Sequence, residues 1–239
     1  SLWSYDGGGG AYVQDMYNMN DSLLFIAGIY KYANNSYVRG FIIFDKDTIQ
    51  GICPFNAYGI SCVYPYKNEI YLGGRFTDVC GNENIRYITT YYDNSFHQFE
   101  PINFGNEICD FCNYHDTLFI CGPFSNSYFG MQGYCIVAYD GIEPIYVGSL
   151  GPYCSSLEVF SEELYAGGDF GVKKYLGGDQ WESLPLQPND YVFELKADSI
   201  NSLLFIGGQF TAVGGQESIG TCIWDGFNMI ATGNYCGAT

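Results

Sequence analysis

The chain of 239 residues is 47% apolar and contains 31 Gly, 23 Tyr and 18 Phe, which excludes a disordered chain and favours strands joined by turns. Its 26 Asp and Glu against nine Lys and Arg give a net charge of −17. This charge argues against nucleic acid and anionic membranes as partners, because no basic stripe offsets it. No apolar run approaches the roughly 20 residues of a membrane span, so membrane insertion is not expected.

In chain order, the first segment is "LWSYDGGGG" at residues 2–10, which resembles the fourth strand of the repeats described next. Residues 1–7 are therefore a candidate ring-closing strand. The last repeat has a fourth strand of its own in "NMIAT" at residues 228–232. Either residues 2–7 or residues 228–232 can form the outermost strand of the last repeat, and the sequence leaves both alternatives open.

A short motif then recurs five times. It reads "FIAGIY" at 25–30, "YLGGRF" at 71–76, "FICGPF" at 119–124, "YAGGDF" at 165–170 and "FIGGQF" at 205–210. Its shared glycines lie 40 to 48 residues apart, close to the ~40–50 residues of one propeller blade. The approximate repeats form a single domain and span residues 8–56, 57–105, 106–152, 153–188 and 189–239.

Each copy has the same kinds of flanking segments. A polar turn precedes the motif, a variable loop follows it, and a third strand ends on an aromatic residue and an aspartate in four of the copies. These pairs are Phe44-Asp45, Tyr92-Asp93, Tyr139-Asp140 and Trp224-Asp225. A fourth short strand closes each copy. Four antiparallel strands per copy predict an all-β fold, a five-bladed β-propeller of four-stranded antiparallel blades.

The glycine pair Gly73-Gly74 interrupts an apolar strand, although glycine weakens a strand and contributes no packing. We interpret the pair as a packing motif where neighbouring blades crowd together. Copies one and three replace the first glycine by Ala27 and Cys121, which are both small. A phosphate-binding glycine loop would need a following helix, which the sequence does not predict.

The fourth copy departs from the pattern. Its loop between the second and third strands shrinks to "GVKK" at 171–174, and "LGGDQ" at 176–180 replaces the aromatic-Asp corner. In a binding face built from these loops, the part that the fourth copy contributes would therefore project less than the rest.

The pattern "LYxGGxF" followed by a loop and "WDG" resembles the repeats of kelch-like and related propellers of bacterial and viral surface proteins and fungal cell-pole proteins. The resemblance spans all five copies and implies a propeller on a cell or particle surface. The expected number of blades is also similar to that of invertebrate lectins and several glycoside hydrolase families, but the likeness is limited to that number. Propellers host lectins, adaptors and enzymes alike, so the resemblance implies little about activity.

The long loops between the second and third strands are rich in Asn, Ser, Tyr and Gly. Amides can bind sugar hydroxyls and tyrosine rings can stack on sugar faces, whereas ordinary solvated loops have the same composition. On the carbohydrate interpretation, the candidate ligand-binding residues are Tyr32, Asn34, Asn35, Asn82, Asn84, Tyr128 and Gln216. We expect ligands at the face formed by these loops and by the crossings between blades.

A glycosidase would need two facing carboxylates. Asp169 is the only carboxylate directly after the glycine pair, and no second carboxylate is assigned to it. His97 and His115 are the only histidines and do not form a triad. No catalytic residue and no metal site is therefore predicted. We expect no cofactor either. The question of a Ca²⁺ ion bound in the propeller channel is left open.

Ten cysteines are an even number, which suits an oxidising compartment. Cys109 and Cys112 form a C-x-x-C, but no second cysteine pair completes a zinc site. A hairpin that turns about His115 would place Cys109 opposite Cys121, which predicts a disulfide between them. Sequons at 20–22 and 34–36 also favour a secreted or surface-exposed protein.

These observations predict a non-enzymatic extracellular or surface recognition module, with carbohydrate as the first ligand class. One alternative is a structural or protein-docking propeller within a larger surface assembly, and a second is a glycoside hydrolase. The expected partner is a glycan or another surface protein.

Overall fold

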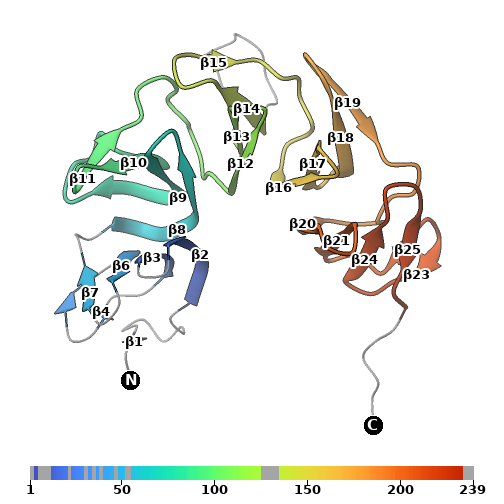
Figure 1. Cartoon of the computed structure of the whole chain (residues 1–239), viewed down its shortest axis with the longest axis horizontal. Coiled ribbons are helices and arrows are strands. Elements are labelled where there is room, and N and C mark those ends of the chain that lie inside the picture. The colour runs from blue at the N-terminus through green and yellow to red at the C-terminus, as the bar shows by residue number, and fades with distance from the viewer. Residues whose placement is uncertain are drawn as a thin grey trace. The chain divides into compact units, whose positions relative to one another are not determined.

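The computed structural model describes residues 3–4, 12–20, 23–29, 32–33, 36–37, 40–45, 48–51, 55–124 and 135–233. Every regular element within these residues is a β-strand (Figure 1). Five four-stranded sheets follow one another along the chain, and each sheet keeps its strands in sequence order. We number these sheets as blades one to five. The predicted fold is confirmed: the chain is all-β and is a five-bladed β-propeller.

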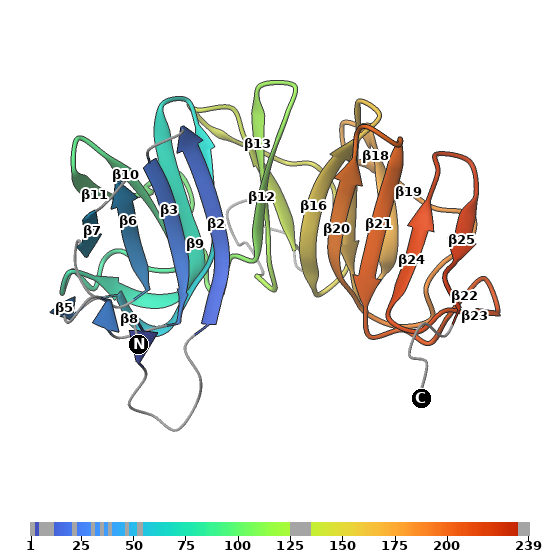
Figure 2. The ribbon, with the colours of Figure 1, turned by 60° about the horizontal axis from the view of Figure 1, so that its bottom comes forward.

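The blades consist of the following strands. Blade one contains β2 (Tyr12–Asn20), β3 (Leu23–Ile29), β6 (Phe41–Asp45) and β7 (Thr48–Gly51). Blade two contains β8 (Phe55–Tyr66), β9 (Glu69–Val79), β10 (Ile88–Tyr92) and β11 (Ser95–Gln98). Blade three contains β12 (Asp110–Tyr114), β13 (Thr117–Cys121), β14 (Ile136–Tyr139) and β15 (Pro144–Ile145). Blade four contains β16 (Cys154–Phe160), β17 (Glu163–Gly168), β18 (Gly171–Gly177) and β19 (Gln180–Ser183). Blade five contains β20 (Val192–Asp198), β21 (Leu203–Gly208), β24 (Thr221–Trp224) and β25 (Met229–Ala231), which Figure 2 shows side by side.

Two small sheets lie in the loops of blades one and five. β4 (Tyr32–Ala33) and β5 (Ser36–Tyr37) form a hairpin between β3 and β6, and β1 (Trp3–Ser4) adds a third strand to it. β22 (Ala212–Val213) pairs with β23 (Gln216–Glu217) between β21 and β24.

The position of β1 answers the question about the outermost strand of the last blade. Trp3 pairs with Ala33, so residues 3–4 extend the loop hairpin of blade one. The outermost strand of blade five is β25, which pairs with β24. The "NMIAT" segment therefore supplies this strand, and residues 3–4 do not. The hairpin β4–β5 offers β1 an edge close in sequence, which a pairing with blade five would not.

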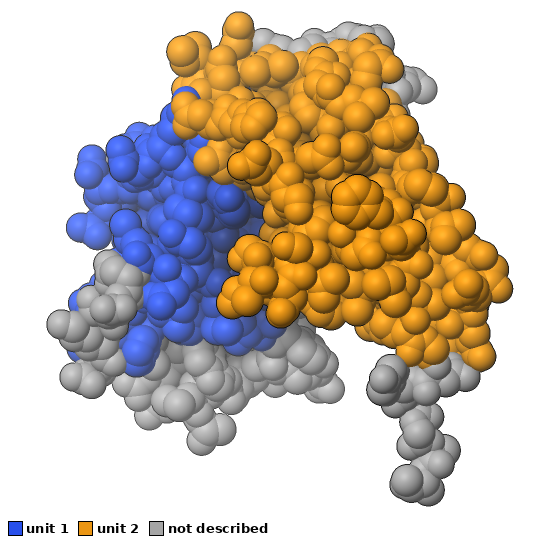
Figure 3. Space-filling model, turned by 45° about the vertical axis from the view of Figure 1, so that its right-hand side comes forward, with its two compact units in different colours: residues 1–111 blue, residues 112–239 orange. Residues whose placement is uncertain are grey.

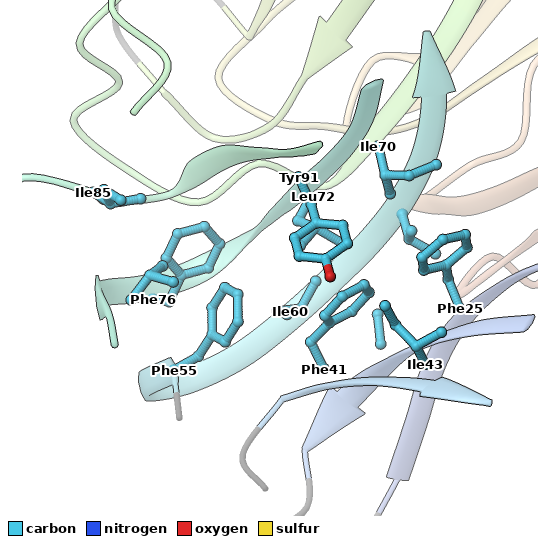
Figure 4. Close-up of a cluster of buried hydrophobic side chains, with 13 residues drawn as sticks. Phe25, Phe41, Ile43, Phe55, Ile60, Ile70, Leu72, Phe76, Ile85 and Tyr91 are labelled. Carbon is cyan, nitrogen blue, oxygen red and sulfur yellow. The ribbon is translucent and has the colours of Figure 1, made fainter. Parts of the chain in front are cut away.

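The chain divides into two compact units, residues 1–111 and residues 112–239, which Figure 3 colours separately. The core of the first unit is rich in aromatic rings (Figure 4). Phe55 meets Phe76 edge to face with ring centroids 5.1 Å apart, and Phe41 meets Tyr91 in the same way at 5.9 Å. Such pairs add about 0.5–1.5 kcal/mol each beyond their area burial. In the second unit, Leu195, Leu204 and Phe210 are fully buried.

Tight turns join the first and second strands of the middle blades. Two residues with positive φ connect these strands in blades two, three and four, as in type I′ turns that match the strand twist. The pairs are Lys67 and Asn68, His115 and Asp116, and Ser161 and Glu162.

The aromatic-Asp corners are also structural. Asp225 Oδ1 accepts hydrogen bonds from the backbone N–H groups of Phe227 and Asn228, at 2.8 and 2.6 Å. Asp140 Oδ1 accepts from Ile142 N and Glu143 N in the same way. The aspartate thus fixes the turn between the third and fourth strands of these blades.

The two glycines of the pair have different roles. A Cβ on Gly167 would lie 2.7 Å from Val192, a side chain of the next blade. A Cβ on Gly168 would instead collide with the carbonyl oxygen of Tyr153 in the same blade, next to a β-bulge in β16. The interpretation as a blade-packing motif therefore holds for the first glycine only. The second glycine accommodates the bulge, and a side chain there would clash with backbone.

Candidate functional site

A cavity of about 480 Å³ lies in blade two, at the end of the sheet formed by the β9–β10 loop and by the segment after β11. This is the face on which sequence reasoning expected ligands. The residues that line the cavity are Glu83, Asn84, Arg86, Tyr87, Ile88, Gln98, Phe99, Glu100, Ile102, Asn103, Phe104 and Gly105. We call it the blade-two pocket.

Backbone and side-chain hydrogen bonds shape the loop on one side of the pocket. Asp78 Oδ1 accepts from Gly81 N at 3.1 Å, where Gly81 takes a φ of +81°. The backbones of Val79 and Asn82 hydrogen-bond to each other in both directions. Asn82 Oδ1 then accepts from Asn84 N at 3.1 Å. The Asn82 side chain therefore positions Asn84, which itself lines the pocket.

Tyr87 is the most unusual residue of the pocket. Its φ of +64° is left-handed, a conformation that costs an aromatic residue about 1–2 kcal/mol. Two backbone hydrogen bonds hold it there, from Tyr87 N to the oxygen of Phe76 and from Gly74 N to the oxygen of Tyr87, both at 3.0 Å. The half-buried ring is thus held at the pocket by the backbone of β9.

Buried apolar side chains and exposed polar side chains both line the pocket. Phe99, Ile102 and Phe104 are buried, and the rings of Phe99 and Phe104 stack with centroids 6.3 Å apart. Arg86 Nε donates to the carbonyl oxygen of Glu83 at 2.7 Å, which fixes the guanidinium beside the loop. The exposed lining side chains provide amide, carboxylate and guanidinium groups, so the pocket can both donate and accept hydrogen bonds.

The structure brings two of the predicted ligand residues together. Asn84 lines the blade-two pocket, and Asn82 supports it from the loop. Gln216 is exposed in β23 of blade five and belongs to a different loop. Tyr32 lies in β4, and its side chain is not among those that the structure describes. Asn34, Asn35 and Tyr128 lie outside the described residues altogether.

Sequence reasoning missed most of this pocket. Arg86 and Tyr87 lie at the end of the β9–β10 loop, and Gln98 and Asn103 lie at the crossing to the next blade. The sequence indicates that such crossings contribute to the binding face, but it singles out none of these four residues. The segment "QFEPINFGN" at 98–106 has the same polar and aromatic composition as the loops, and this signal could have identified it.

Asp169 and the histidines do not form a second site. Asp169 lies in the turn between β17 and β18, and its Oδ1 is buried without a hydrogen-bond partner among the described residues. His97 stacks on Tyr92 at 3.7 Å, and His115 forms a hairpin turn. No group of three or more His, Cys, Asp or Glu side chains suited to a metal ion occurs among the described residues.

The cysteines differ from the predicted pairing. Cys109 and Cys121 each carry a thiol. The hairpin between β12 and β13 turns on two residues, His115 and Asp116, so its centre lies half a residue beyond His115. This geometry removes the argument for a link between Cys109 and Cys121. Cys80 at the end of β9 is disulfide-bonded, and its partner is none of the other described cysteines.

A second cavity, of about 430 Å³, lies at the hairpin turns of blades one and two. Tyr17, Met19, Tyr66 and Tyr92 give it an aromatic and apolar lining, and Lys67 lies over the Tyr66 ring at 5.2 Å. It lies at the turns that join the strands of these blades in pairs.

No helix in the part of the chain that the structure describes is long and apolar enough to cross a membrane.

Comparison with known proteins adds no assignment. No protein-family model matches the chain, and no curated protein matches it. The five-bladed β-propeller fold is therefore the assignment that the chain itself supports.

Proposed function

We propose that the protein is a non-enzymatic recognition module that binds carbohydrate in the blade-two pocket. The observation that carries the proposal is Tyr87, an aromatic residue kept in a left-handed conformation at the edge of a polar pocket. Strain of this kind concentrates at binding sites, where the surrounding structure fixes a side chain for a ligand. A tyrosine ring offers a sugar both an apolar face and a hydroxyl group.

The other lining groups fit the same ligand class. Asn84, Gln98 and Asn103 present three amides, each able to donate and accept hydrogen bonds to neighbouring hydroxyl groups. Glu83 and Glu100 outnumber Arg86 among the charged groups of the pocket, and the whole chain carries a charge of −17. The ligand is therefore neutral or carries an amino group, since sialylated or sulfated glycans would be repelled.

The repeat pattern and the cysteines bear on the family and the location of the protein. We assign the five copies to the kelch-like "LYxGGxF" repeats on the strength of the motif alone. The disulfide at Cys80 and the two sequons favour an extracellular or surface location.

A glycan array followed by calorimetry tests the proposal. We expect hits among neutral or amino-bearing glycans, and at least a tenfold loss of affinity in Asn84→Ala and in Asn103→Ala. Gln216→Ala, which removes an exposed amide from the corresponding loop of blade five, is the matched control and should bind normally. An array without hits, or hits unaffected by both pocket variants, would contradict the proposal.

A glycoside hydrolase remains the enzymatic alternative because two carboxylates, Glu83 and Glu100, line the same pocket. Aryl glycosides offered to the wild type, to Glu83→Gln and to Glu100→Gln separate the two functions. Turnover that either variant abolishes while sugar binding persists would make the protein an enzyme. We expect no turnover in any of the three.

Protein docking is the second candidate, and the cavity at the hairpin turns favours it. Met19 and Tyr92 are exposed beside this cavity, and exposed apolar groups that gather around a hollow are typical of protein contacts. Cross-linking at Met19→Cys in a surface extract, combined with a negative glycan array, would favour docking over carbohydrate recognition.

A further inference from the structure

Three hairpin turns hold the most exposed large apolar side chains of the described residues. Ile142 is 84% exposed, Ile200 is 91% exposed and Phe227 is 86% exposed. Each of them lies two residues after an aspartate, in the sequences "DGI", "DSI" and "DGF" at 140–142, 198–200 and 225–227. Positions of this kind in a turn are usually polar. A single exposed apolar residue is ordinary, but three at one turn position form a set.

The same pair of hydrogen bonds fixes each of these turns. Asp198 Oδ1 accepts from Ile200 N at 3.0 Å and from Asn201 N at 3.1 Å. Asp140 and Asp225 accept from the equivalent N–H groups of their own turns. Because the turn backbone is already fixed, contact with a partner costs little further conformational entropy.

Ile200 and Phe227 project from the same end of blade five. The strands of this blade follow one another in sequence order, so its first and last turns lie at one end of the sheet. Figure 2 shows the β20–β21 and β24–β25 turns at that end. Two strand spacings, about 10 Å, separate the two turns. We call the surface that Ile200 and Phe227 form the blade-five tip.

The blade-five tip is open for a reason that lies within blade five itself. Blades of a propeller contact one another through the flat sides of their sheets, as Val192 contacts Gly167. A hairpin turn instead projects beyond the end of its sheet. The exposure of Ile200 and Phe227 therefore does not depend on where a neighbouring blade lies.

The surroundings of the tip are acidic. Residues 112–239 contain 14 Asp and Glu, three Lys and no Arg, which gives a net charge of −11. Each lysine already has a partner among these residues. Lys173 donates to the carbonyl oxygen of Leu150, Lys174 pairs with Glu163, and Lys196 pairs with Glu158. Because Asp198 and Asp225 lie in the two turns of the tip, a positively charged partner is favoured and an anionic membrane is repelled.

We propose that the blade-five tip docks a basic amphipathic helix of a partner protein. Ile200 and Phe227 contact the apolar stripe of this helix, and the turn aspartates face the lysines and arginines beside the stripe. Such a helix combines the two properties that the tip selects, because basic side chains border its apolar face. The contact uses none of the residues that line the blade-two pocket. Its test is therefore independent of the proposed carbohydrate binding.

A labelled synthetic helix of leucine and lysine with one apolar face is the probe, and fluorescence anisotropy measures its affinity. A scrambled peptide of the same composition, which lacks the apolar face, measures attraction by charge alone. We expect the wild type to bind the amphipathic peptide at least tenfold more tightly than the scrambled one. The double variant Ile200→Ser with Phe227→Ser should lose this preference. Both side chains are exposed, so the variant should keep the urea midpoint of the wild type.

A matched variant and salt provide the controls. Ile219→Ser removes an exposed apolar side chain from the loop at the opposite end of blade five and should bind the amphipathic peptide normally. Binding should weaken between about 0.15 M and about 1 M salt, where charges are screened beyond about 3 Å. Equal affinity of the wild type and the double variant, or equal affinity for the two peptides, would overturn the proposal. So would flotation with phosphatidylcholine vesicles that the double variant abolishes, because a lipid surface would then be the occupant.

Discussion

The Ser156 hydroxyl oxygen lies 3.1 Å from the backbone nitrogen of Leu195 and accepts its hydrogen bond, which ties the first strand of blade four to the first strand of blade five. Both residues are buried. Loss of the hydroxyl would leave a buried N–H without its partner, and such a loss costs about 1–3 kcal/mol. We expect Ser156→Ala to lower the free energy of unfolding by this amount in urea titrations. Ser183→Ala, at an exposed position of β19, should have no effect.

The first glycine of the pair in blade four should be required because the next blade covers it. A Cβ on Gly167 would lie 2.7 Å from Val192, whereas one on Gly105 would meet nothing within 4 Å. Overpacking of this kind typically costs about 1–3 kcal/mol. We expect Gly167→Ala to destabilise the protein by that amount and Gly105→Ala to be neutral or slightly stabilising. Urea midpoints measured in dilute solution compare the two, and equal losses would refute the distinction.

Tyr87 should show opposite effects on stability and on binding. Glycine adopts a left-handed φ without strain, so Tyr87→Gly relieves a backbone cost of about 1–2 kcal/mol. We expect the melting temperature to stay within a few degrees of the wild type while glycan affinity falls at least tenfold. A large loss of stability would instead assign the ring a structural role and would weaken the case for the pocket. Tyr92→Gly, at an exposed tyrosine outside the pocket, is the control for loss of a surface ring.

Stability in acid should depend on the turn aspartates. The N–H groups of Asn228 and Phe227 bond to the Asp225 carboxylate and lower its pKa below the usual value. A carboxyl whose pKa is lower in the folded state stabilises the protein above the unfolded pKa of about 3.9, and this contribution is lost as the pH falls through the folded pKa. We expect Asp225→Asn to reduce the difference in urea midpoint between pH 6 and pH 3. An unchanged difference would show that the turn does not contribute.

The buried thiols should react only after unfolding. Burial raises the pKa of Cys222 to about 12, and the neighbouring Cys154 thiol together with burial raises the pKa of Cys135. Because the thiolate is the reactive form, both should resist Ellman's reagent at pH 8 in the native protein and react at the rate of unfolding. Peptide mapping without reduction should also recover a Cys80 disulfide. Rapid native labelling of Cys135 or Cys222 would contradict the buried placement.

The sequence predicted the fold because each repeat signals the same unit at several levels. The motif spacing, the aromatic-Asp corners and the polar turns all indicate four short strands, and consistency of this kind is typical of a sequence with one stable fold. The roles of the two glycines were not separable from the sequence. The collision of Gly168 with the carbonyl of Tyr153 depends on a bulge in β16, and a bulge shifts register without leaving a compositional sign.

The candidate site was predictable only in part for a similar reason. Asn82 and Asn84 look alike in the loop sequence, but one side chain bonds back to the loop and the other lines the pocket. Tyr87 lines the pocket with a left-handed backbone conformation, which strand propensity does not predict. The expected pairing of Cys109 with Cys121 depended on the centre of one turn, and a two-residue turn moved that centre by half a position.

The contact of Val192 with Gly167 has a consequence for how the sequence can change during evolution. Because a side chain of blade five fills the space that a glycine leaves in blade four, a larger residue at position 167 would require a smaller one at position 192. The two positions are therefore expected to change together and not one at a time.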